Sequence, residues 1–295
     1  MYTAAGKSKD ADFTALCEAG YNARAAVSNS AELVEAWIAD AANFRQTAEC
    51  ALDIPYLDPV AGGTERTFLD IFWPKDTDRQ TCPIAVFIHG GYWQSQDRKN
   101  FSHLANGLNE NGIAVVMPSY NLCPQANVGS ITDQIAAACT WVWRNYGRRI
   151  AVGGHSAGGH LTAAMMIRDF SALGAPSDLV TNGLPISGLF DLRDLVVTSI
   201  NDKAGMSAEE AISWSPLLHD APTSGNLHAW VGGAESEAFH WQTREIAKRW
   251  KKSGLTTSHH AGKDDNHFTI IDALCDPKSK MTKQFTELAR NALEV

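Results

Sequence analysis

The sequence has no long apolar run and no cluster of basic residues, and each absence excludes a class of protein. A helix that spans a bilayer needs about 20 consecutive apolar residues, and no stretch here approaches that length. The formal net charge of −8 disfavours nucleic acid and anionic membranes as partners. Residues 1–12 are polar and lack the apolar core of a secretory signal peptide. We therefore expect a cytoplasmic protein with no stable membrane association.

Cysteine is also sparse, and its spacing carries no motif. None of the six cysteines forms a C-x-x-C pair, and no Cys/His spacing resembles a zinc site. Scattered cysteines of this kind are typical of free thiols in a reducing compartment. The sequence therefore predicts neither structural disulfides nor a metal centre.

The order of apolar runs indicates the fold class. Beyond residue 84, short runs rich in β-branched residues alternate with helical patterns. This alternation predicts one α/β domain over 1–295, with a mostly parallel sheet covered by helices on both faces. Residues 1–46 are expected to form an N-terminal helical segment. A helix is expected near 98–110, and residues 268–271 are expected to open a terminal helix. Residues 188–220 interrupt the alternation and predict a small cap insertion, with a plain surface insertion as the alternative.

The pentapeptide Gly154-His155-Ser156-Ala157-Gly158 is the most informative motif. It follows a strand-like run, 149–153, and precedes a helix-forming run, 160–167. A serine between a strand and a helix, flanked by glycines, is typical of a nucleophile elbow, where the turn is too tight for side chains at the flanks. The motif therefore predicts Ser156 as a nucleophile.

A second motif, His89-Gly90-Gly91-Tyr92-Trp93, follows the predicted strand 84–88. Loops of this HGG type present backbone N–H groups to the oxyanion of an acyl-transfer intermediate. We expect the oxyanion donors to be Gly90, Gly91 and Ala157, with Ala157 contributing the amide that follows the nucleophile. His89 is expected to brace this loop.

The acid and the histidine should follow later strands, in that order. Glu235 lies just beyond the predicted strand 227–231, and His267 lies beyond the predicted strand 255–260. These positions predict His267 as the general base and Glu235 as the carboxylate that orients it. Asp264 and Asp265 compete with Glu235 for that role, and Glu237 is a weaker alternative.

Four aromatic residues are candidates for the substrate pocket because of their places near these motifs: Tyr92, Trp93, Trp214 and Phe239. Such rings would suit an aromatic leaving group. For Trp93 the alternative is packing against the sheet.

Together, the motifs resemble those of the α/β-hydrolase superfamily, in its branch with hormone-sensitive-lipase-type HGG loops. Within that branch, HGGYW and GHSAGGHL look like the arylformamidase (kynurenine formamidase) group and its bacterial esterase relatives. Many members carry Asp where this chain has Glu235. The resemblance implies a serine hydrolase that needs no cofactor and acts on a small acyl substrate.

Three functions are compatible with these residues. The leading hypothesis is an arylformamidase-like amidase, and the alternative is a short-chain carboxylesterase. A non-catalytic binding protein on the same scaffold is disfavoured because nucleophile, base and oxyanion loop are all present. The sequence is compatible with a homodimer and does not determine the oligomeric state.

Overall fold

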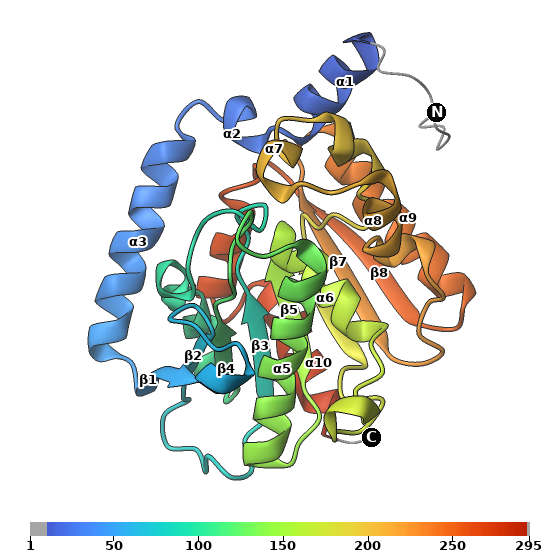
Figure 1. Cartoon of the computed structure of the whole chain (residues 1–295). Helices are drawn as coiled ribbons and strands as arrows, with labels where there is room; N and C mark the ends of the chain where they lie inside the picture. Colours follow the sequence, from blue (N-terminus) through green and yellow to red (C-terminus); the bar gives the residue numbers. More distant parts are fainter. Residues whose placement is uncertain (1–10, 294–295) are drawn as a thin grey trace.

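The computed structural model describes residues 11–293, which form one eight-stranded sheet with helices on both faces (Figure 1). The strand order is β1-β2-β4-β3-β5-β6-β7-β8, and all neighbours from β4 to β8 are parallel. Strand β2 pairs antiparallel with both of its neighbours, β1 and β4. The observed fold confirms the predicted α/β-hydrolase class. The strands are β1 Cys50–Pro55, β2 Phe68–Phe72, β3 Ile84–Ile88, β4 Ala114–Pro118, β5 Ala151–His155, β6 Asn182–Ile186, β7 Asn226–Gly232 and β8 Thr256–Gly262.

The helices lie in two layers and at the top of the sheet. Helices α5, α6 and α9 belong to the core on one face, and α3, α4 and α10 belong to the core on the other. The helices are α1 Ala11–Tyr21, α2 Ala23–Ala26, α3 Ser30–Thr47, α4 Asn106–Glu110, α5 Val128–Tyr146, α6 Ala157–Met166, α7 Asn201–Ala204, α8 Ala208–Ser213, α9 Glu237–Lys252 and α10 Lys280–Asn291.

The central strands are buried on both faces, which explains their continuous apolar sequences. In β3, Ile84, Val86 and Ile88 face one core, whereas Ala85 and Phe87 face the other. Successive side chains of a strand point to opposite faces, so both layers of helices pack on the same five residues. The carboxyl ends of the parallel strands consequently meet at one edge of the sheet, where the loops after β3, β5, β7 and β8 lie close together.

Two segments differ in detail from the sequence-based expectation. Residues 98–110 form two short 3₁₀ turns, Arg98–Asn100 and Ser102–Ala105, followed by α4, instead of one helix. The helix expected directly after His267 is a 3₁₀ turn, Ile270–Cys275, and the terminal helix α10 begins only at Lys280. Both segments are held by side-chain contacts to distant strands and loops, which local sequence preferences do not encode.

Of the predicted N-terminal segment, residues 11–47 form α1, α2 and α3, and residues 1–10 lie outside the described part of the chain. The segment 188–220 contains α7, α8 and two 3₁₀ turns, Arg193–Val197 and Pro216–Leu218. Its function as a cap stays a prediction. Within residues 11–293, no helix combines the length and apolarity that crossing a membrane requires.

Helix α10 shows how side-chain burial stabilises this arrangement. The ring of Phe285 is fully buried, and a Cβ added at Gly153 of β5 would lie 2.6 Å from its Cζ. The glycine and the ring are therefore matched in shape. We expect Phe285→Ala to lower the free energy of unfolding by about 3–5 kcal/mol, because it removes a large buried ring and leaves a cavity. Urea denaturation followed by tryptophan fluorescence would measure the change.

Lys283→Ala is the matched control, because Lys283 is exposed on the same helix. It should change the free energy of unfolding by no more than about 0.5 kcal/mol. Equal effects of the two substitutions would contradict the packing argument.

Candidate active site

Ser156 occupies a sharp turn between β5 and α6. Its backbone has φ 58° and ψ −117°, a conformation that non-glycine residues rarely adopt, and its N–H donates to the carbonyl of Ile186 at 2.8 Å. A Cβ at Gly154 would lie 2.4 Å from the carbonyl oxygen of Gly158, and one at Gly158 would lie 2.0 Å from that of Ile88. Only glycine fits at both flanks, which is the strained turn predicted for a nucleophile elbow.

The HGG loop lies directly against this turn. A Cβ at Gly90 would lie 2.7 Å from the carbonyl oxygen of His155, and Gly91 has a φ of +103°. Among the hydrogen bonds of residues 11–293, none is donated by the backbone amides of Gly90, Gly91 or Ala157. These amides are therefore available to an oxyanion that forms beside Ser156, as the sequence predicts for an oxyanion hole.

Glu235 and His267 come from different loops and form a buried pair. His267 Nδ1 donates to Glu235 Oε2 at 2.6 Å, and the two side chains are only 7% and 1% exposed. The other carboxylate oxygen, Oε1, accepts from Gly232 N at 2.7 Å and from the hydroxyl of Ser187. A carboxylate fixed on both oxygens holds the imidazole in one orientation and stabilises its protonated form.

The other candidate acids lie elsewhere. Asp265 accepts from the hydroxyl of Thr269 at 3.4 Å, Asp264 is exposed, and Glu237 pairs with Arg244 on α9. The structure therefore brings Glu235, and none of these three, into contact with His267.

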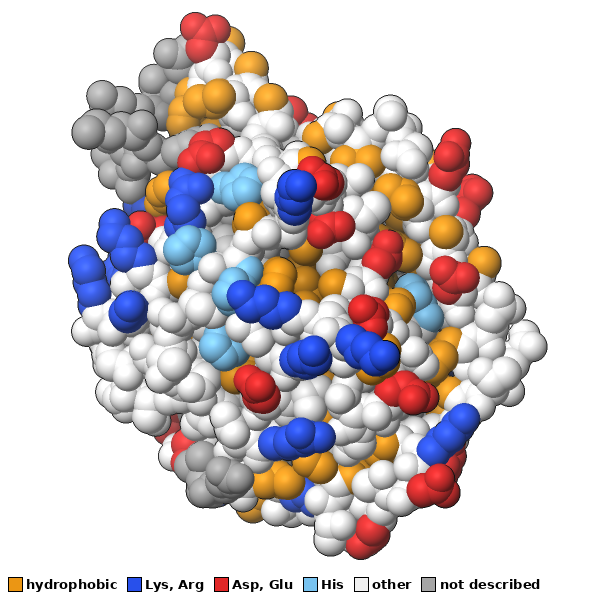
Figure 2. Space-filling model, turned by 180° about the vertical axis from the view of Figure 1, so that it is seen from behind, with side chains coloured by type: hydrophobic (Ala, Val, Ile, Leu, Met, Phe, Trp, Pro, Cys, Tyr) orange, Lys and Arg blue, Asp and Glu red, His pale blue; other side chains and the backbone are white. Residues whose placement is uncertain are grey.

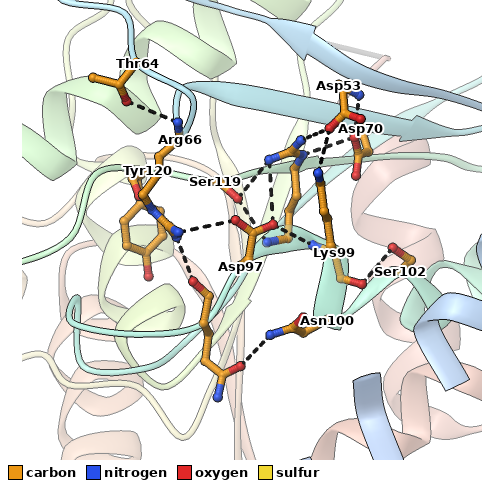
Figure 3. Close-up of polar contacts among 12 residues, drawn as sticks. Asp53, Thr64, Arg66, Asp70, Asp97, Lys99, Asn100, Ser102, Ser119 and Tyr120 are labelled. Carbon is orange, nitrogen blue, oxygen red and sulfur yellow. Dashed lines mark hydrogen bonds and ion pairs between the residues drawn. The ribbon is translucent and has the colours of Figure 1, made fainter. Parts of the chain in front are cut away.

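A network of charged and polar residues braces the far side of the HGG loop (Figure 3). Arg66 donates to the carbonyls of Gln96 at 2.7 Å and Tyr120 at 2.8 Å. The Tyr120 hydroxyl donates to the carbonyl of His89 at 2.9 Å, and the two rings stack 4.3 Å apart. The loop backbone is thus fixed from below, and His89 takes the bracing position that the sequence predicts for it.

The same network is anchored on a buried arginine. Arg98 is 2% exposed and pairs with Asp53 and, at 3.1 Å, with the fully buried Asp70. Its backbone N–H donates to Ser119 Oγ at 3.0 Å (Figure 3). Arg45 also contacts Asp70, at 2.6 Å. Buried charges that lack a partner are costly, so the two buried ions, Arg98 and Asp70, require each other.

Several buried histidines surround the site in neutral form. Burial lowers the pKa of His89 and of His160 to about 4, because a charged imidazole loses its hydration. Burial and the neighbouring His267 keep the pKa of His155 well below its usual range. Neutral His155 donates from Nε2 to the carbonyl of His267 at 2.8 Å. It therefore fixes the backbone that carries the base.

Ser156 and His267 line one cavity of about 330 Å³ at the carboxyl edge of the sheet. This volume lies near the lower end of the range for small-molecule sites, about 300–1,000 Å³. Tyr92 lines the cavity as predicted, and its hydroxyl donates to the carbonyl of Tyr21. Gly90 and Gly91 line it as well.

Three of the predicted aromatic residues do not line this cavity. Trp93 is fully buried and packs edge-to-face on His160, with ring centroids 5.2 Å apart. Trp214 lies in a separate hollow beside Arg168, and its carbonyl accepts from His160 Nε2 at 2.7 Å. Phe239 packs 4.7 Å from the ring of His267 and lines only a small space of about 20 Å³ behind it. The prediction that these rings form the substrate pocket is corrected accordingly.

The sequence did not predict most of the residues that form the wall of the cavity. The wall includes three aromatic residues, Trp37, Phe101 and Phe268, and residues from both the N-terminal segment and the 188–220 segment. These residues lie in segments whose position depends on tertiary contacts, so no local pattern marks them as part of the wall. Within residues 11–293, no cluster of three or more His, Cys, Asp or Glu side chains could hold a metal ion.

Comparison with known proteins agrees with this geometry. The BD-FAE family model matches residues 69–172. The chain is 31% identical to kynurenine formamidase of Drosophila melanogaster, over 73% of this chain and 76% of that protein. It is 27% identical to kynurenine formamidase of Danio rerio, over 81% and 82% of the two chains. A crystal structure from Silicibacter sp. TM1040, provisionally described as a thioesterase, is 35% identical with a TM-score of 0.80, and the match covers 90% of this chain and 97% of that one.

The contact between Glu235 and His267 leads to a test of the acid. We expect Glu235→Gln to lower kcat for p-nitrophenyl acetate by about 10²–10⁴-fold, because the amide neither stabilises the imidazolium nor enforces the same tautomer. Asp264→Asn is the control, and its kcat should stay within about threefold of the wild-type value, since Asp264 is exposed and does not contact His267. A large loss in Asp264→Asn with an active Glu235→Gln would refute the assignment.

The buried histidines predict loss of stability in mild acid. His89, His103 and His160 have folded pKa values of about 4 because of burial, and His155 is lowered in the same direction. The unfolded chain binds their protons near pH 6.5, so stability is full above that pH and falls as the pH drops toward 4. Each histidine contributes about 1.4 kcal/mol per pH unit in this window. Burial raises the pKa of Asp272 to about 6, so in mild acid the folded state binds a proton there that the unfolded state does not. This single proton opposes the loss of stability caused by the histidines.

Urea denaturation at several pH values would measure this dependence. His103 lies outside the site, so His103→Gln should reduce the slope between pH 6 and 5 by about one proton while leaving esterase activity in place. A slope that is unchanged in this variant, or a stability that is flat from pH 7 to 5, would contradict the prediction.

Proposed function

Because the chain belongs to the α/β-hydrolase family that includes the kynurenine formamidases, we propose that it is an arylformamidase-like serine hydrolase. Membership at this level makes it a hydrolase of the amidase or esterase type. The finer proposal depends on one observation above all. Ser156, the Glu235–His267 pair and unbonded amides of the HGG loop meet at a single small cavity.

These groups support acyl transfer through an acyl-enzyme. His267 Nε2 accepts the proton of Ser156 as the hydroxyl oxygen attacks the carbonyl carbon of the substrate. The Gly90, Gly91 and Ala157 amides donate to the oxyanion, and loss of one donor would raise the barrier by about 3 kcal/mol. His267 then protonates the leaving amine or alcohol. Water attacks the acyl-enzyme by the same route in reverse and releases Ser156.

The lining of the cavity favours an aromatic leaving group. Trp37 packs against Phe101 and Phe268, with ring centroids 5.4 and 5.6 Å apart, and all three line the cavity that holds Ser156. Stacked and edge-on contacts with such rings favour a flat aryl group. The cavity of about 330 Å³ suits a small acyl group such as formyl or acetyl more than a long acyl chain. An N-formyl-arylamine fits both features.

A short-chain carboxylesterase is the second candidate, because the same groups cleave esters and an alcohol is an easier leaving group than an amine. The relative kcat/KM values for N-formylkynurenine and p-nitrophenyl acetate separate the two functions. A chain-length series of p-nitrophenyl esters would define the acyl preference.

We expect N-formylkynurenine to be hydrolysed with a higher kcat/KM than p-nitrophenyl acetate, and both activities to fall at least about 10³-fold in Ser156→Ala. Absorbance of the released amine or nitrophenolate measures both reactions. Ser213→Ala is the control, because Ser213 is exposed and distant from the cavity lining. Ester turnover without formamide turnover would leave the serine mechanism intact and favour the carboxylesterase. Full activity in Ser156→Ala would overturn the mechanism.

A further inference from the structure

Two cationic side chains, and no acidic ones, are among the residues that line the active-site cavity. Arg24 and Lys203 are the charged Lys, Arg, Asp or Glu side chains among its lining residues, and no Asp or Glu of the described residues lines it. The whole chain has 33 acidic and 25 basic residues, so a positive cavity runs against its overall balance. The face of the molecule seen from behind mixes Lys and Arg with Asp and Glu (Figure 2). The cavity therefore differs from that surface in the sign of its charge.

Arg24 lies on α2 and Lys203 lies on α7, two short helices at the top of the sheet in Figure 1. Both residues line the active-site cavity. Arg24 is on α2, whose N-terminal Asn22 accepts from Ala25 N at 3.1 Å. The carbonyl of Arg24 accepts from Ser30 Oγ at 3.2 Å. The two side chains are exposed, so they reach solvent and substrate from a defined backbone.

Lys203 is held in a similar way. It lies on α7, where Asn201 accepts from Met206 N at 2.8 Å and donates to Met206 O at 2.9 Å. The side-chain amide of Gln94, in the HGG loop, donates to the carbonyl of Ile200 just before α7. The position of Lys203 is thereby tied to the oxyanion loop.

No carboxylate within the described residues forms an ion pair with either of these two cations. The ion pairs found within residues 11–293 include neither Arg24 nor Lys203. Glu18 lies nearby, but it accepts from Ser199 N and Oγ and from Asn22 Nδ2. Asp202 lines a different surface hollow, beside α1. The Glu18 carboxylate stays charged beside the cavity, because hydrogen bonds from Ser199 and Asn22 lower its pKa. Neither Arg24 nor Lys203 has an ion-pair partner among the described residues, so both can pair with a ligand.

We propose that the cavity selects aromatic acyl compounds that carry a carboxylate. The ring lies against Trp37 and Phe268, the scissile carbonyl lies at Ser156, and the carboxylate pairs with Arg24 and Lys203 at the mouth. This inference rests on the proposed function, because it takes Ser156 as the reacting atom. It also predicts that a substrate ammonium gains nothing, since no lining carboxylate would bind it. A formamidobenzoate is thus preferred over its neutral amide analogue.

The expected effect is moderate and sensitive to salt. Ion pairs of exposed side chains are weak individually, and two of them acting together give a preference of about tenfold. A positive cavity mouth with apolar walls concentrates anions near the site, and this contribution is screened at high ionic strength. The preference should therefore appear in KM and not in kcat.

Matched substrate pairs test this proposal. 3-Formamidobenzoate and 3-formamidobenzamide differ in one charge at nearly constant shape. 3-Acetoxybenzoate and 3-acetoxybenzamide form the same pair as esters. For each pair we expect a kcat/KM ratio of about ten in favour of the anion at 10 mM salt, falling toward one at 500 mM.

The double variant Arg24→Gln/Lys203→Gln should abolish the ratio by raising KM for the anions, with kcat within about twofold. Lys251→Gln is the control, because Lys251 is exposed on α9 and lines a different hollow. It should keep the ratio. Ratios near one in the wild type, or equal losses for anion and amide in the double variant, would overturn the proposal.

The two pairs separate this inference from the proposed function. Charge preference among the esters with no formamide turnover would support the carboxylate site and reject the formamidase. Turnover of both formamides at equal kcat/KM would support the formamidase and reject the carboxylate site. If neither pair is hydrolysed, calorimetric binding to Ser156→Ala decides the matter: 3-formamidobenzoate should bind about tenfold more tightly than its amide, and equal affinity would refute the site.

Discussion

The close approach of three backbone segments at Ser156 is the constraint on which the rest of the site depends. The end of β3, the end of β5 and the start of α6 meet with no room for side chains at Gly90, Gly154 or Gly158. This contact places the serine hydroxyl, the amide of Ala157 and the amides of the HGG loop within one small volume. Electrostatic stabilisation of an oxyanion needs donors that are already in position before the charge develops. The glycines provide that arrangement through backbone contact alone, so little of it depends on mobile side chains.

A second set of contacts attaches the N-terminal segment to the same centre. The carbonyl of Tyr21 accepts from the Tyr92 hydroxyl, and that of Gly20 accepts from Ser236, the residue after Glu235. The hydroxyl of Tyr21 accepts from Gln242 Nε2 at 2.9 Å, inside the buried core. The segment therefore bonds to the oxyanion loop and to the acid loop at once. These bonds make α1 and the residues that follow it a structural part of the candidate site.

The structure brings the predicted centre together, whereas three of the four aromatic residues predicted to line the pocket lie elsewhere, and the reason is physical. Ser156, Glu235 and His267 follow strands in a known order, and the tight turns leave glycine signatures that are readable at short range. The structure places Glu235 against His267, a choice that the sequence left open with Asp264 and Asp265. The walls of the cavity carry no such local signal. Trp37 and Lys203 reach it from segments far from every motif, whereas Trp93 and Trp214, each close to a motif or to the predicted cap, lie away from it, in contact with His160. Proximity in sequence to a motif is therefore a weak guide to proximity in space.

This division between centre and wall follows from what each part must do. Acyl transfer requires the nucleophile, base and oxyanion donors to keep their mutual positions to within fractions of an ångström, so they stand on strand ends and on turns where only one backbone conformation fits. Recognition of a flat ring or of a carboxylate tolerates more variation, because apolar contact is not directional and the attraction between charges falls off slowly with distance. In the proposed function, short helices such as α2 and α7 would be sufficient for that task. Their exposed charged residues form no ion pairs within the described residues, so the proposed substrate choice could change through them while the proposed serine chemistry stays the same.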